Sequence, residues 1–117
     1  MKLVYAVIAA LSLVPMTAVA DDTSSEIEYL LSAIGSSECT FVRNGKRHPA
    51  VKAEQHLRTK YDRGRRYATS TEKFIERLAS QSSITRRTYM IECPGAEPVP
   101  TGEWLTKRLA ALRERSP

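Results

Sequence analysis

The sequence predicts a small α+β protein of one domain, with the element order α-β-α-α-β-α. Four segments place apolar residues at helical spacing, and two short segments are rich in β-branched and aromatic residues. A cysteine stands in each of the two strand-like segments. Two short strands are marginally stable alone, so we expect helices to cover an antiparallel pair. The domain is expected to span residues 21–117.

The first 20 residues have the layout of a secretory signal peptide. Lys2 precedes a largely apolar run over residues 3–14, which Pro15 interrupts, and residues 18–20 (AVA) resemble a cleavage site. The run is too short to cross a bilayer, which takes about 20 residues. We therefore expect a Sec-type signal peptide over residues 1–20, cleavage between Ala20 and Asp21, export into an oxidising compartment and no transmembrane span after cleavage.

The next elements are a helix, a strand and a turn. Residues 23–25 offer N-caps for the helix, and Gly35 is placed to end it. Its apolar stripe consists of Ile27, Leu30, Leu31 and Ile34. Residues 39–42 (CTFV) predict a strand, and Asn44-Gly45 predicts a turn. The polar residues 46–49 (KRHP) favour a loop into the next helix over a second strand of a hairpin.

The second half of the chain supplies the remaining elements. Pro49 suits the start of a helix, and Thr69 with Glu72 predicts a capping box for another one. Residues 88–93 (TYMIEC) predict the second strand, and a proline-rich linker over residues 96–102 leads to the last helix. The apolar stripes of these three helices are Ala50, Ala53, Leu57 and Tyr61, then Phe74, Ile75, Leu78 and Ala79, then Trp104, Leu105, Leu109 and Leu112.

Cys39 and Cys93 are the two cysteines of the chain. An even count in a small exported domain favours a disulfide over a metal site or a reactive thiol. The bridge would join the first strand to the end of the second strand, so the two strands are expected to be neighbours.

Basic residues are unevenly distributed. The whole chain carries 18 Lys and Arg against 13 Asp and Glu, and residues 43–66 are strongly cationic whereas residues 21–40 are acidic. Arginine forks suit phosphate and carboxylate groups, and the interleaved Tyr61 and Tyr67 can stack on ligands. The candidate residues for binding an anionic partner are Arg43, Arg47, Lys60, Arg63, Arg65, Arg66, Arg86 and Arg87. A solvated surface without a partner explains the same charges.

For an exported bacterial protein, which the family resemblance given below implies, the partner classes that fit such a surface are lipopolysaccharide, a glycan or an acidic protein, and nucleic acid is not expected. We expect no catalytic residue, cofactor or metal. His48 and His56 lie eight residues apart, which is not a two-histidine ligand spacing. Residues 83–86 (SITR) place arginine where an S-x-x-K nucleophile needs lysine. The alternatives are a small periplasmic hydrolase that uses His48 or His56 with an acidic partner, and a purely structural envelope protein.

Three blocks of the sequence carry a family resemblance. FVRNGKRH at residues 41–48, AEQHLRTK at residues 53–60 and TSTEKFIERLASQSSITRRTY at residues 69–89 resemble the YfeK-like family of small exported bacterial proteins. The blocks lie in order within residues 41–89, about half of the expected mature chain, and Arg86-Arg87 departs from the Gly-Lys typical of the family. The resemblance implies a bacterial, periplasmic, single-domain protein. It implies no function, because that of the family is unknown.

Overall fold

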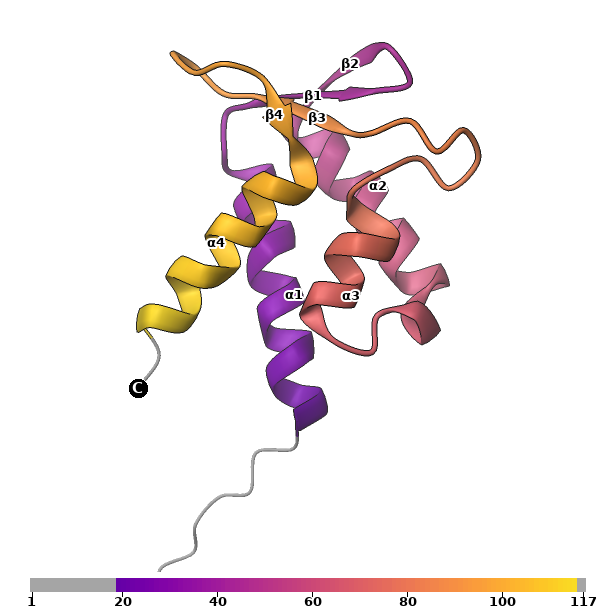
Figure 1. The fold of residues 1–117 in the computed structure, drawn as a ribbon, viewed down its shortest axis with the longest axis vertical. Helices are drawn as coiled ribbons and strands as arrows, with labels where there is room; N and C mark the ends of the chain where they lie inside the picture. The colour runs from indigo at the N-terminus through magenta and orange to yellow at the C-terminus, as the bar shows by residue number, and fades with distance from the viewer. Residues whose placement is uncertain (1–18, 116–117) are drawn as a thin grey trace, which may run out of the picture.

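One four-stranded sheet lies across one end of a group of helices in the computed structural model, which describes residues 19–115 (Figure 1). Residues 1–18 of the expected signal peptide lie outside the described residues. The elements are, in chain order, α1 (Val19–Gly35), β1 (Thr40–Arg43), β2 (Lys46–Pro49), α2 (Ala50–Arg63), the 3₁₀ turn η1 (Arg65–Tyr67), α3 (Thr71–Phe74), the π-helical turn η2 (Ile75–Ala79), β3 (Met90–Glu92), β4 (Val99–Pro100) and α4 (Thr101–Arg115).

Helix α1 is the centre of the hydrophobic core. The predicted stripe Ile27, Leu30, Leu31 and Ile34 is fully buried, with 0% of each side chain exposed. Helices α2, α3 and α4 all contact α1, and Figure 1 shows α1 between α4 on one side and α3 on the other. Full burial of each such side chain contributes about 1.5–3 kcal/mol before entropy is subtracted. Helix α1 is therefore the element that the other three helices share as a packing partner.

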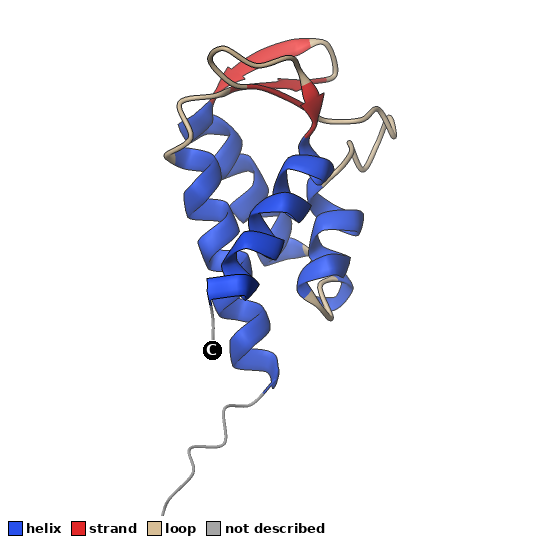
Figure 2. Ribbon diagram, turned by 60° about the vertical axis from the view of Figure 1, so that its left-hand side comes forward, coloured by secondary structure: helices blue, strands red, loops and turns tan. Residues whose placement is uncertain are grey.

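The sheet is antiparallel throughout, with the strand order β2-β1-β3-β4. The predicted pairing of the two strand segments is confirmed: Phe41 of β1 lies opposite Ile91 of β3. Both side chains are buried in the core, and side chains alternate between the two faces of a strand. Figures 1 and 2 show the sheet as a lid across one end of the helices. The fold class is therefore α+β, as expected.

The prediction that residues 46–49 form a loop is wrong, because they form strand β2. Asn44 and Gly45 both have positive φ, 51° and 77°. That conformation is required at both central residues of a type I′ hairpin turn, and Asn-Gly is the dipeptide that favours it. Strand β2 is an edge strand with mostly exposed side chains, so it needs no apolar alternation. The turn chemistry outweighs the poor strand propensity of Lys46–Pro49.

Three boundaries also differ from the prediction. Helix α1 begins at Val19, before the capping residues expected at positions 23–25. The third helix is capped by Ser70, whose hydroxyl accepts a hydrogen bond from the Lys73 N–H at 3.0 Å, and not by Thr69. The proline-rich linker contributes the short strand β4, which pairs with β3, so the sheet has four strands where two were expected.

Two arginines tie helices together at the surface. Arg58 of α2 bonds to Glu28 of α1 and to Glu54. Arg113 of α4 bonds to Glu26 of α1 and to Glu72 of α3. The hydrogen bond from Arg113 is the main cause that lowers the pKa of both Glu26 and Glu72. Among the described residues, no helix is long and apolar enough to cross a membrane.

The predicted disulfide between Cys39 and Cys93 is present. Cys39 directly precedes β1 and Cys93 directly follows β3, at ends that the antiparallel pairing places side by side. The bridge therefore locks the β1–β3 register, which is also the register that buries Phe41 and Ile91.

Removing the disulfide is expected to lower the free energy of unfolding by roughly 4 kcal/mol. The bridge joins residues 54 positions apart, and the unfolded chain gains conformational entropy when this link is removed. The measurement is urea unfolding of the Cys39→Ala/Cys93→Ala double variant, with the wild type under reducing conditions as the matched control. A loss below about 1 kcal/mol in both samples contradicts a major role for the bridge.

Candidate functional site

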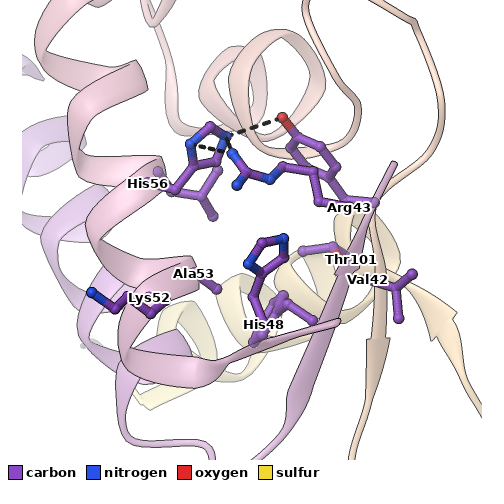
Figure 3. Close-up of a pocket in the computed structure, with 10 residues that line it drawn as sticks. Val42, Arg43, His48, Lys52, Ala53, His56 and Thr101 are labelled. Carbon is purple, nitrogen blue, oxygen red and sulfur yellow. Dashed lines mark hydrogen bonds between the residues drawn. The ribbon is translucent and has the colours of Figure 1, made fainter. Parts of the chain in front are cut away.

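A small cavity lies between the β1–β2 hairpin and helix α2 (Figure 3). Strand β1 contributes Arg43, strand β2 contributes His48, and α2 contributes His56. The His48 ring points across the gap toward Arg43 and His56. The two histidines, eight residues apart in the sequence, therefore line one cavity. The cavity is lined by Phe41, Val42, Arg43, His48, Lys52, Ala53, His56, Leu57, Tyr89 and Thr101.

A chain of polar contacts runs along one side of this cavity. The Arg43 guanidinium nitrogen Nη1 lies 2.6 Å from His56 Nδ1 and 2.9 Å from Nε2. His56 Nε2 lies 3.3 Å from the Tyr89 hydroxyl. Lys60 Nζ donates to that hydroxyl at 3.1 Å and to the carbonyl of Gln81 at 3.0 Å. His56 and Lys60 meet Tyr89 together because they lie one turn apart on α2.

The electrostatic field in this region is positive. Burial, followed by the Arg43 guanidinium and the Lys60 ammonium, lowers the pKa of His56 to about 4. Burial and Arg43 lower the pKa of Lys60 to about 8. Burial, Arg43 and Lys46 also lower the pKa of His48. In the described part of the chain, no carboxylate lines the cavity, and neither Arg43 nor Lys60 forms an ion pair with one.

Two buried polar atoms in the cavity wall have no hydrogen-bond partner among the described residues. They are Nε2 of His48 and Oγ1 of Thr101. Thr101 begins α4 and is 0% exposed, and its backbone N–H donates to the Tyr89 carbonyl at 2.8 Å. Leaving a buried polar atom unsatisfied costs about 1–3 kcal/mol. Native proteins contain few buried polar atoms without a hydrogen-bond partner, so each one needs a physical explanation.

The structure does not gather the eight basic candidates at one place. Arg43 and Arg87 lie at the hairpin, and a Cβ atom placed on Gly45 would be 3.7 Å from the Arg87 guanidinium. Lys60 lies in the last turn of α2 with Arg63, although its ammonium group bonds to the Tyr89 hydroxyl of the cavity wall. Arg65 and Arg66 follow that turn in η1.

Several of the candidates have partners within the protein. Arg47 forms an ion pair with Glu92. Arg65 bonds to Asp62 at 3.4 Å and lies over the Tyr61 ring. The guanidinium of Arg66 lies over the ring of Tyr67 and bonds to its hydroxyl. Arg86 lines a separate groove with Tyr67 and Arg77.

Sequence reasoning missed four residues of the hairpin end. Lys46 stands two residues before His48 on the same face of β2, while Lys52, Tyr89 and Thr101 line the cavity. The local signals that could have found two of them are the spacing of Lys46 and His48, two residues apart on a strand, and that of Lys52 and His56, four residues apart on α2. Among the described residues, no group of three His, Cys, Asp or Glu side chains is placed to hold a metal ion.

These features define a small disulfide-bonded α+β domain with a half-buried cationic cluster beneath a hairpin. Comparison with known proteins then places the chain: residues 21–113 match the model described as "Family of unknown function (DUF5329)". The chain belongs to this family. It is 39% identical over 90 residues to the protein named "Uncharacterized protein YfeK" of Salmonella typhimurium, covering 75% of each chain, which confirms the YfeK-like resemblance. No solved structure matches.

The low pKa of His56 makes the stability of the protein depend on pH. The pKa is about 4 in the folded state against an ordinary value of 6.5, so between these values the unfolded chain binds a proton that the folded chain does not. The free energy of unfolding is therefore expected to rise from pH 4 to 6.5, by about 1–3 kcal/mol once partial exposure is allowed for.

Urea unfolding of the wild type and of His56→Gln across this range measures the effect. The His56→Gln variant is expected to lose most of the slope, whereas the matched His48→Gln variant keeps the part due to His56. The lowered pKa values of Glu26, Glu28 and Glu72 add to the slope around and below their ordinary value of 4.5, at the acid end of this range, and they do so in the wild type and in both variants alike. Equal slopes in the wild type and in His56→Gln contradict the assignment.

Proposed function

We propose that this protein is an exported, non-catalytic binding module that contacts an anionic component of the cell envelope through the hairpin end of the domain. The contact surface, here called the hairpin cluster, consists of Arg43, Lys46, Lys52, Lys60 and Arg87. The observation that carries the proposal is the half-buried pair Arg43 and Lys60, which lacks a carboxylate partner among the described residues.

Partly buried cations without a carboxylate partner are uncommon on a surface that serves only the fold. Half-burial removes part of the hydration of a charged group, and a nearby carboxylate normally offsets that cost. In the hairpin cluster, each additional cation raises the cost, as the lowered pKa of Lys60 indicates. A phosphate or carboxylate group from a partner would relieve this repulsion. The arrangement therefore favours an anion-binding role over a solvated face.

The rest of the described surface supports the same reading by contrast. Arg113 is paired with carboxylates of α1 and α3, and Arg58 is paired with Glu28 of α1 and with Glu54 of its own helix. Those arginines act in the fold, whereas the hairpin cluster is left without such pairs. Lys46, Lys52 and Arg87 are exposed and surround the more buried Arg43, so they are placed to steer an anionic group toward it.

Binding to purified lipopolysaccharide is expected to weaken at high salt and to weaken by roughly tenfold or more in the Lys46→Glu/Lys52→Glu/Arg87→Glu variant, because screened or reversed charges attract less. The matched control reverses three exposed charges elsewhere, Lys73→Glu/Lys107→Glu/Arg108→Glu, and is expected to keep most of the affinity. The binding measurement is light scattering or surface plasmon resonance at low and high salt.

Further ligands distinguish the partner classes, and a further variant distinguishes the hairpin cluster from the arginines of segment 63–66. Dephosphorylated lipopolysaccharide, an acidic glycan and polyglutamate replace the phosphorylated ligand in parallel titrations. The variant Arg63→Glu/Arg65→Glu/Arg66→Glu tests the opposite end of α2. Loss of binding in that variant alone contradicts the hairpin cluster as the site. Absence of binding to every ligand at low salt contradicts the anion-binding function.

Export is the second part of the proposal, and it rests on the layout of the first 20 residues. Protein recovered from the periplasm of an expressing bacterium is expected to begin at Asp21 and to have the mass of the chain with Cys39 and Cys93 oxidised, two hydrogens below the reduced chain. Intact-mass spectrometry before and after reduction measures both. Retention of Met1 in the recovered protein contradicts cleavage after Ala20.

A further inference from the structure

The cavity beneath the hairpin has room for one small group. Its volume is about 20 Å³, and a water-sized group needs about 10–15 Å³ of such space. A whole phosphate or sugar does not fit, but a single oxygen atom does. The exposed side chain of Lys52 lines the cavity, so the space reaches the surface there and a larger ligand can remain outside.

Most of the cavity wall is apolar, and two buried polar atoms without partners within residues 19–115 belong to the residues that line it. His48 Nε2 and Thr101 Oγ1 have no partner among the residues that the structure describes, and both residues line the space. A hydroxyl can donate a hydrogen bond, and the neutral imidazole tautomer protonated at Nε2 donates another. Arg43 adds a positive charge, and the described lining contains no carboxylate. Hydrogen-bond donors and the positive charge of Arg43, with no carboxylate in the described lining, favour binding of an oxyanion and disfavour binding of a cation.

We propose that the cavity is an oxyanion subsite, in which one oxygen of a carboxylate or phosphate group accepts hydrogen bonds from Thr101 Oγ1 and His48 Nε2 beside the Arg43 guanidinium. This inference rests on the proposed function, since the oxyanion is the terminal group of the anionic partner that the hairpin cluster attracts. The subsite adds a geometric requirement to the contact with the anionic partner, because the partner must present a terminal oxygen atom that can enter the cavity.

An ordered water is the competing occupant. A buried water commonly makes about three hydrogen bonds, so it would also satisfy His48 and Thr101. It would leave the charges of Arg43 and Lys52 without a counterion. The two occupants therefore differ in how the site responds to anions in solution.

Titration of the full chain with sodium acetate and with inorganic phosphate tests the proposal, with sodium chloride at equal ionic strength as the control. The readout is the nuclear magnetic resonance shift of the His48 ring nitrogens. Acetate or phosphate is expected to produce a saturable shift that chloride does not. The stronger of the two probes identifies the carboxylate or the phosphate as the preferred source. A response to acetate and phosphate no larger than that to chloride overturns the proposal and leaves water as the occupant.

A matched pair of substitutions at Thr101 adds a second criterion. Thr101→Val keeps the shape but removes the hydroxyl, whereas Thr101→Ser keeps the hydroxyl. The valine variant is expected to bind the anion roughly tenfold more weakly, and the serine variant close to the wild type. Thermal unfolding of each variant verifies that the fold persists. Equal anion affinity in Thr101→Val and the wild type overturns the subsite.

Lipopolysaccharide binding by the same variants separates the two proposals. One outcome is that charge reversal of Lys46, Lys52 and Arg87 abolishes lipopolysaccharide binding, whereas Thr101→Val changes neither lipopolysaccharide binding nor small-anion affinity. In that case the subsite is wrong and the proposed function stands. If Thr101→Val weakens acetate or phosphate binding while no macromolecular ligand binds at any salt, the anion-binding partner proposed above is wrong and the cavity chemistry stands.

Discussion

The antiparallel pairing of β1 with β3 is the constraint on which both the core and the candidate site depend. It places Phe41 opposite Ile91, and the disulfide between Cys39 and Cys93 holds the strand ends at which this register begins. Continuing the same register toward the hairpin places Arg43 near Tyr89 and Gly45 near Arg87. A shift by one residue would turn Phe41 or Ile91 out of the core. Burial of these two side chains therefore also positions Arg43 and Arg87.

The basic residues fall into two groups by their partners. Arg113 joins α4 to α1 and α3 through Glu26 and Glu72, Arg58 joins α2 to α1, and Arg47 pairs with Glu92 in the sheet. Exposed ion pairs of this kind contribute about 0–1 kcal/mol each, so they orient the elements more than they hold them. At the cavity, Arg43 and Lys60 instead contact neutral groups of His56, Tyr89 and Gln81. That contrast is the basis of the proposed anion-binding surface.

Local chemistry explains which predictions from the sequence are confirmed and which are wrong. The α1 stripe and the pairing of the two strand segments follow from apolar periodicity and from the position of the two cysteines, and both are present. Strand β2 was missed because an edge strand needs no apolar alternation, although Asn44-Gly45 is a type I′ turn signal. Strand β4 was missed because it is a two-residue extension in a proline-rich linker, held by pairing with β3.

The sequence by itself determined the fold class, the helix stripes, the disulfide and the excess of basic residues, because each is encoded in local periodicity, residue type or count. Only the tertiary structure decided which of those basic residues meet. His48 and His56 face one cavity with Thr101, a residue 53 positions after His48 (101 − 48), and Arg63 to Arg66 lie at the opposite end of α2 from Arg43. The reason is physical: contacts between distant segments depend on how helices and strands pack and register, and no local pattern carries that information.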